Sequence, residues 1–149
     1  MNNSTLNLDR LAAQHAQEII RRLVIEEEAQ KDKKDKKKSK QDLARGTDNT
    51  VTKALGVLQE DGVYACFLYL LAKEKENGAV VVDAMLSLLN GLGFGWNKPL
   101  KNGQPDLNAE TVLKHITEKV TVNLQQLLLA KETLEQMLIY TRYGAKAYY

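Results

Sequence analysis

The segment from Val51 to Leu89 constrains the fold of this chain more than any other. Two turn signals, Glu60-Asp61-Gly62 and Glu76-Asn77-Gly78, divide it into three apolar blocks. Glycine after Asp or Asn commonly ends a helix, because glycine readily adopts the left-handed backbone angles of a C-cap. The segment therefore predicts three consecutive helices of about 10–16 residues each.

The middle block, Val63 to Ala72, is the most apolar part of the chain and contains no charged residue. A helix that is apolar on every side is expected to be buried on every side. It is far shorter than the ~20 residues that cross a bilayer, so we expect no membrane contact. We predict that this block is the central core helix. Its Cys66, the one cysteine of the chain, is expected to be a small buried core residue.

The rest of the chain also favours helix. Good helix formers dominate the 149 residues, prolines number 2, and no segment shows sustained alternation of apolar and polar residues. We predict an all-α fold: a compact bundle of about five or six helices with a long C-terminal helix, in one domain covering residues 1–149. The C-terminal helix is expected to begin near Val120. Its apolar stripe comprises Val120, Leu124, Leu127, Ala130, Leu134, Met137, Thr141 and Ala145.

A lysine-rich run occupies residues 31–46 and holds 8 basic and 3 acidic residues, although the net charge of the whole chain is only +2. Two structures fit this run. Pairs such as Glu27 with Lys31 suit one long solvated helix, whereas the repulsion among its lysines and the missing apolar stripe suit a linker. We favour the linker. The capping residues Thr47-Asp48-Asn49-Thr50 follow it and are expected to open the next helix.

Glycines and both prolines concentrate in residues 91–107, which predicts an irregular loop with a turn at Asn102-Gly103. Gly91, Gly93 and Gly95 lack the spacing and the strand–helix context of a phosphate-binding loop. Loops of this length often carry function. Trp96 has three possible roles: stacking on a base, docking on a neighbouring subunit, or packing over its own core.

Residues suited to catalysis or metal binding are sparse. The chain has two histidines, His15 and His115, far apart in the sequence, and one cysteine cannot form a CxxC site. We expect His15, which lies on the apolar stripe of the first helix, to be structural. We therefore predict a non-enzyme with no metal and no cofactor. A single cysteine and a polar amino terminus predict a cytoplasmic protein.

Two blocks of the sequence resemble a known family. The first, Lys53 to Lys73, has a basic residue, an amphipathic stretch, a glycine after a polar pair, and an apolar helix that ends in lysine. The second, Leu128 to Ala147, is a C-terminal helix with an aromatic residue after a basic one, Arg142-Tyr143. Their order and spacing resemble the small helical subunit of type III-B CRISPR effector complexes, the Cmr small subunit, or its equivalent in a related multi-subunit CRISPR complex.

This resemblance implies a non-catalytic RNA-binding scaffold in antiviral defence. Copies of such a subunit stack beside the other effector subunits and contact the backbone of the guide RNA–target RNA duplex. The partners implied are therefore guide RNA, target RNA, other CRISPR subunits and further copies of the chain itself. Lys53 and Arg142 match the family's basic positions. Arg45, beside the lysine-rich run, and Lys131 and Lys146, on the polar face of the last helix, are our additional candidates.

A protein-binding role is the alternative to RNA binding. In that case the chain is a helical adaptor that contacts other proteins through the apolar loop around Phe94 and Trp96 and has no direct contact with nucleic acid.

Overall fold

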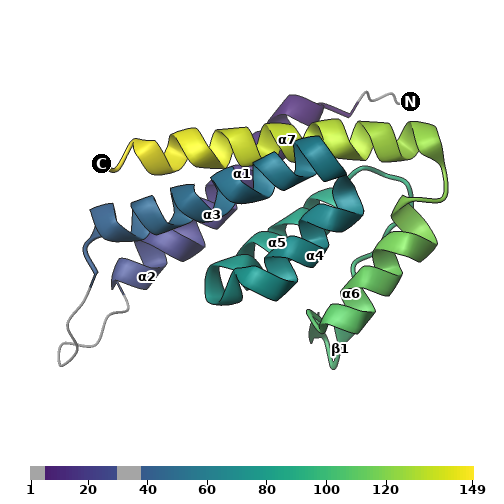
Figure 1. The fold of residues 1–149 in the computed structure, drawn as a ribbon, viewed down its shortest axis with the longest axis horizontal. Helices are drawn as coiled ribbons and strands as arrows, with labels where there is room; N and C mark the ends of the chain where they lie inside the picture. Colours follow the sequence, from purple (N-terminus) through teal and green to yellow (C-terminus); the bar gives the residue numbers. More distant parts are fainter. Residues whose placement is uncertain (1–5, 30–37) are drawn as a thin grey trace.

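The computed structural model describes residues 6–29 and 38–149. Within them, six continuous helical segments and one short β-hairpin form an all-α bundle that ends in a long helix, as predicted (Figure 1). The helices are α1 (Leu8–Ile20), continued through a π-helical turn (Arg21–Ile25) into α2 (Glu26–Ala29), then α3 (Lys40–Asp61), α4 (Val63–Lys73), α5 (Lys75–Asn90), α6 (Ala109–His115), continued by a second π-helical turn (Ile116–Val120), and α7 (Leu124–Lys146).

The long helix α7 organises the bundle, because it packs against both α1 and α3 along much of its length (Figure 1). Asn123 caps it by accepting a hydrogen bond from the Gln126 backbone N–H, so it begins a few residues later than predicted. Most of its predicted stripe is buried, but Leu124 is exposed. The antiparallel pair α4–α5 lies beside this layer, and α6 packs against α4.

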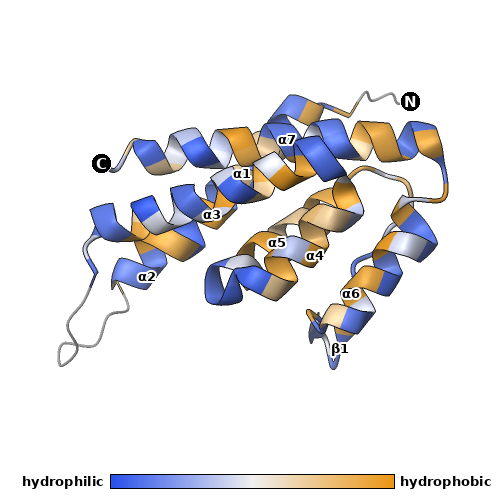
Figure 2. Cartoon of the chain, viewed as in Figure 1, coloured by the Kyte–Doolittle hydropathy of each residue, from blue (hydrophilic) through white to orange (hydrophobic). Residues whose placement is uncertain are grey.

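The central helix is α5, so the prediction for Val63–Ala72 is wrong. Six consecutive residues of α5, Val81 to Leu86, are buried, whereas Tyr64 and Leu68 of α4 are exposed. Helix α4 contacts α3, α5 and α6 but leaves its Tyr64–Leu68 side open to solvent. Figure 2 shows hydrophobic residues along both helices, which explains why hydropathy alone does not separate them. Cys66 itself is buried, as predicted.

Two predicted helix boundaries are also wrong. The break before α5 lies at Glu74, not at Gly78, and Gly78 is inside the helix. A Cβ atom at Gly78 would lie 2.6 Å from the carbonyl oxygen of Leu70, so glycine here permits close contact with the end of α4. Likewise, Thr47 to Thr50 lie within α3, whose actual N-cap is Ser39. Residues 40–46 of the predicted linker are therefore helical, and residues 30–37 lie outside the described part of the chain.

The segment 91–107 is irregular, as predicted, apart from a minimal hairpin formed by β1 (Leu100–Lys101) and β2 (Gln104–Pro105). Asn102 and Gly103, both with positive φ, form its turn. Trp96 is only 3% exposed and packs edge-on against Phe94, with ring centroids 4.9 Å apart. Of its three possible roles, the structure therefore selects packing over the protein's own core.

Candidate nucleic-acid interface

The exposed side of α3 carries two of the predicted basic residues, Arg45 and Lys53. They are eight residues apart, which corresponds to about 12 Å along a helix. Asn49, Thr52 and Gly56, at helical spacing between and after them, are exposed as well. Among the described residues, Lys53 forms no ion pair, and Arg45 has only a long contact of 3.5 Å from Nη1 to Oδ1 of Asp42. The two charges therefore face solvent on one helix surface.

The C-terminal end of α7 lies next to the first turns of α3 and adds aromatic rings to this surface. The guanidinium carbon of Arg45 lies 4.9 Å from the ring centroid of Tyr149, and Nζ of Lys146 lies 5.8 Å from the same centroid. Lys40 is placed similarly, 5.8 Å from the ring of Tyr148. We call these three cations, Lys53 and the two tyrosines the α3/α7 basic face. It unites three of the five predicted residues: Arg45, Lys53 and Lys146.

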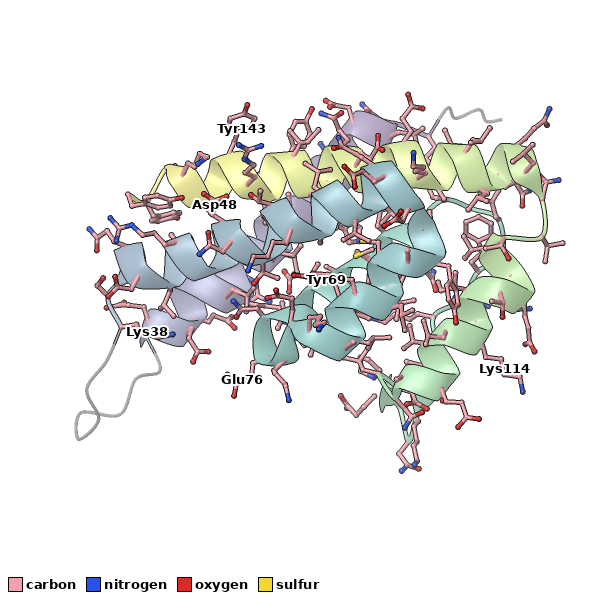
Figure 3. The ribbon with its side chains drawn as sticks, in the orientation of Figure 1. Lys38, Asp48, Tyr69, Glu76, Lys114 and Tyr143 are labelled. Atoms are coloured by element: carbon pink, nitrogen blue, oxygen red, sulfur yellow. The ribbon has the colours of Figure 1, made fainter. Side chains whose placement is uncertain are left out.

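A buried carboxylate holds this arrangement together. Asp48 is buried on α3 and accepts hydrogen bonds from Nζ of Lys146 at 3.0 Å, from Oγ1 of Thr52 at 2.8 Å and from the hydroxyl of Tyr149. Figure 3 shows Asp48 at the junction of α3 and α7. Burial raises the pKa of the Asp48 carboxyl, but the hydrogen bonds from Tyr149, Lys146 and Thr52 lower it below its ordinary value.

The same contact limits what Lys146 can offer a ligand. Its hydrogen bond to Asp48 raises the pKa of the ammonium group, so Lys146 stays charged, but that charge is already paired. The hydrogen bond to Asp48 likewise raises the pKa of the Tyr149 hydroxyl. Arg45 and Lys53 are therefore the principal cations of the α3/α7 basic face toward solvent.

The other two predicted residues, Lys131 and Arg142, are both half-buried. Lys131 is half-buried and forms an ion pair with Glu135, with 3.6 Å between Nζ and Oε2. It precedes Lys146 by 15 residues, or about 22 Å of helix. Arg142, one turn before Lys146, is half-buried, and its Nε atom lacks a hydrogen-bond partner among the described residues. Tyr143, by contrast, projects outward from α7 (Figure 3).

Sequence reasoning missed Lys40, Asp48 and the role of the last two tyrosines. The tyrosines at the C-terminus are visible in the sequence. Their partners on α3 could not be identified from it, because Asp48 precedes them by about a hundred positions. Asp48 lies in a run of residues typical of helix caps, so the sequence suggests a capping role instead of the buried hydrogen-bond acceptor found in α3.

The comparisons with known proteins do not identify this chain: no protein-family model matches it, and no curated protein is found to be similar. Over residues 6–29 and 38–149, each helix is too short or too polar to cross a membrane. The thiol of Cys66 lies 3.4 Å from the carbonyl oxygen of Ala54, and burial raises its pKa to about 12. A thiol in this environment stays protonated, which suits a packing role.

Proposed function

We propose that this protein is a non-catalytic small subunit of an RNA-guided CRISPR ribonucleoprotein effector complex in antiviral defence. In this proposal several copies stack beside the other effector subunits in the cytoplasm and contact the backbone of the guide RNA–target RNA duplex. The observation that carries the proposal is the α3/α7 basic face, where Arg45 and Lys53 lie on one exposed helix surface and Arg45 lies beside the ring of Tyr149. Such contacts to phosphates bind any target sequence, because they do not read the bases.

The test reverses both exposed charges, in the variant Arg45→Glu with Lys53→Glu. Arg142 and Lys146 are unsuitable for it, since Arg142 is half-buried and Lys146 binds Asp48. The matched control is Lys101→Glu with Lys114→Glu, which makes the same change in net charge on exposed residues of the hairpin and α6. Figure 1 shows the hairpin and α6 far from the end where α3 begins.

The measurement is target-RNA binding by the reconstituted complex across a salt series. Each lost phosphate contact reduces the slope of log K against log salt by about 0.7–0.9, so the test variant should lose about 1.5 per copy in contact. The control should keep the parent slope. Equal slopes for parent and test variant would contradict the proposed role of the α3/α7 basic face.

A protein-binding adaptor remains the second candidate function, because apolar side chains are exposed where α7 begins. Val122, Leu124 and Leu128 are 72%, 67% and 56% exposed. The predicted adaptor surface around Trp96 is not available, since that side chain is buried. If Leu124→Ser with Leu128→Ser abolishes association with effector subunits while the charge-reversed variant binds RNA like the parent, the adaptor role is favoured.

A further inference from the structure

A polar pocket of about 370 Å³ lies between α1, α5 and the loop that leads into β1. None of its lining residues belongs to α3 or α7, so it is separate from the α3/α7 basic face. Its volume falls within the range of small-ligand sites. Its polar lining consists of Gln14, His15, Glu18, Arg22, Asp83, Ser87 and Lys98.

Asp83 organises this pocket. Its carboxylate is buried within the apolar α5 and accepts hydrogen bonds on separate oxygens, from Nη1 of Arg22 at 2.8 Å and from Nζ of Lys98 at 2.9 Å. A buried carboxylate is costly unless it is paired, and here it has two cationic partners. One negative charge therefore fixes the positions of two positive charges, and the Arg22–Asp83–Lys98 cluster by itself carries a net charge of +1. The carboxylate of Glu18 also lines the pocket. Both of its oxygens accept hydrogen bonds from Arg21, whose positive charge compensates it.

Hydrogen-bond donors remain available around this positive charge. Among the described residues, Arg22 uses only one of its five N–H groups on Asp83. Lys98 uses two of its three, on Asp83 and on the hydroxyl of Ser87 at 2.8 Å. Because Ser87 accepts that bond, its own hydrogen can be donated to a ligand. The exposed Gln14 amide adds further donors at the rim.

His15 completes the rim. Its Nδ1 atom lies 2.9 Å from the carbonyl oxygen of Leu11, which can only accept, so Nδ1 carries a hydrogen. The ring is thereby fixed in orientation, with Nε2 as its remaining polar atom. The pocket thus adds a hydroxyl and an amide to the positively charged Arg22–Asp83–Lys98 cluster, beside a glutamate whose charge Arg21 compensates. This set of donors suits an anion with several acceptor oxygens.

We propose that this pocket binds a phosphate group, with Arg22 and Lys98 as the charge partners and Ser87 and Gln14 as neutral donors. A cationic ligand would find both lining carboxylates already engaged, Asp83 by Arg22 and Lys98 and Glu18 by Arg21. An apolar ligand would leave these donors without partners. The phosphate can come from the backbone of RNA or from a small phosphorylated molecule. Only the first source rests on the function proposed above.

The test titrates the isolated full-length protein with inorganic phosphate at constant ionic strength and follows backbone amides by NMR. The amides of His15, Ser87 and Lys98 should shift together and saturate, with a Kd on the order of 1 mM, as expected for a small anion. Shifts that stay linear up to high phosphate concentration, or that spread over the whole surface, would show an unspecific charge effect and overturn the proposal.

A pair of variants separates a binding pocket from a purely structural ion cluster. Gln14→Glu adds a negative charge at the pocket rim without touching the Arg22–Asp83–Lys98 cluster, and should weaken phosphate binding by about fivefold or more. Gln17→Glu makes the same change on the same helix but lines a different pocket, against α7, and should change the Kd by less than about twofold. Both glutamines are exposed, so both variants should fold. Equal effects of the two variants would overturn the proposal.

Two further probes distinguish the sources of phosphate. A single-stranded RNA oligonucleotide without terminal phosphates should displace inorganic phosphate from these amides if the backbone is the ligand. Adenosine monophosphate should do so if a small molecule is the ligand. If neither displaces it, the pocket has no phosphate ligand of biological size and the proposal fails. The Arg45→Glu/Lys53→Glu variant should keep phosphate binding, so the two proposals can fail independently.

Discussion

The carboxylate of Asp48 accepts a hydrogen bond at 3.0 Å from Nζ of Lys146, a residue 98 positions later in the chain. The contact joins the middle of α3 to the last turn of α7. Because Tyr149 donates to the same carboxylate, the end of the chain is fixed on α3 as well. The position of the aromatic rings beside Arg45 therefore depends on one buried acid.

Replacing this acid should destabilise the protein. Asp48→Ala removes the shared acceptor of three donors, and because those donors can turn toward water, we expect a loss of about 2 kcal/mol in the free energy of unfolding. Urea denaturation measures it. Glu132→Ala, at an exposed site on α7, is the control and should stay within about 0.5 kcal/mol of the parent. If the two variants are equally stable, Asp48 does not anchor the C-terminus.

Two glycines inside helices should respond in opposite directions to alanine. A Cβ at Gly78 would lie 2.6 Å from the carbonyl oxygen of Leu70 and 2.9 Å from Cβ of Glu74, so the backbone of α4 or α5 must shift. We expect Gly78→Ala to cost about 2 kcal/mol. Gly56, on the open side of α3, has no atom within 4 Å of its added Cβ. Gly56→Ala should stabilise the protein by about 0.5–1 kcal/mol, because alanine favours helix. Thermal melts of both variants test the opposite signs.

The exposed side of α4 provides a third prediction. Leu68 is 45% exposed, whereas Leu70 on the same helix is 1% exposed. Leu68→Asp should therefore leave the protein folded, with a change of about 1 kcal/mol or less. Leu70→Asp places an unpaired carboxylate in the core and should cost several kcal/mol, a large part of a typical stability of ~5–15 kcal/mol. Circular dichroism of the two variants measures how much helix each retains. If Leu68→Asp unfolds the chain, α4 is the buried central helix that hydropathy suggests.

Local signals predicted the parts of this fold that depend on neighbouring residues. The turn at Asn102-Gly103 is present, Cys66 is buried, and the α7 stripe is largely buried. The predictions were wrong where contact with a distant segment determines the local structure. Gly78 follows Asn77 like a C-cap glycine, but it lies inside α5 and allows close contact with the end of α4. Hydropathy does not show whether α4 or α5 has neighbours on all sides.

The candidate site was predictable to a similar degree. Lys53 could be placed on a helix surface from sequence, because exposure follows helical spacing. Arg45 was expected at the end of the linker, but it lies within α3. The pairing of Lys146 with Asp48 could not be predicted, because the two residues are distant in the sequence. The pairing of Lys131 with Glu135 was visible in the sequence as an i,i+4 spacing of opposite charges. Asp83, the one charged residue of α5 after its first turn, was a visible signal for a buried ionic cluster.

His115 makes the stability of the fold depend on pH near neutrality. The side chain is buried at the end of α6, and its Nε2 atom has no hydrogen-bond partner among the described residues. Burial, followed by the charge of Lys119, lowers the pKa of the imidazole below its ordinary value of 6.5. The folded state therefore prefers the neutral ring, while the unfolded chain takes up a proton at its ordinary pKa.

The sign of the effect follows from this difference. Well above pH 6.5 the ring is neutral in both states and contributes no pH dependence. As the pH falls from 6.5 toward the lowered pKa, the unfolded state binds a proton that the folded state does not, so stability should fall, with a slope of at most about 1.4 kcal/mol per pH unit. Urea denaturation between pH 5 and 8 should show this loss in the parent and not in His115→Gln. Lys119→Gln should reduce it only partly, because burial is the larger cause. Loss of the Asp48 contacts falls in a separate range below the ordinary carboxyl pKa of 3.8. A parent whose stability is constant from pH 8 to 5 would mean that His115 is hydrated and accepts its proton freely.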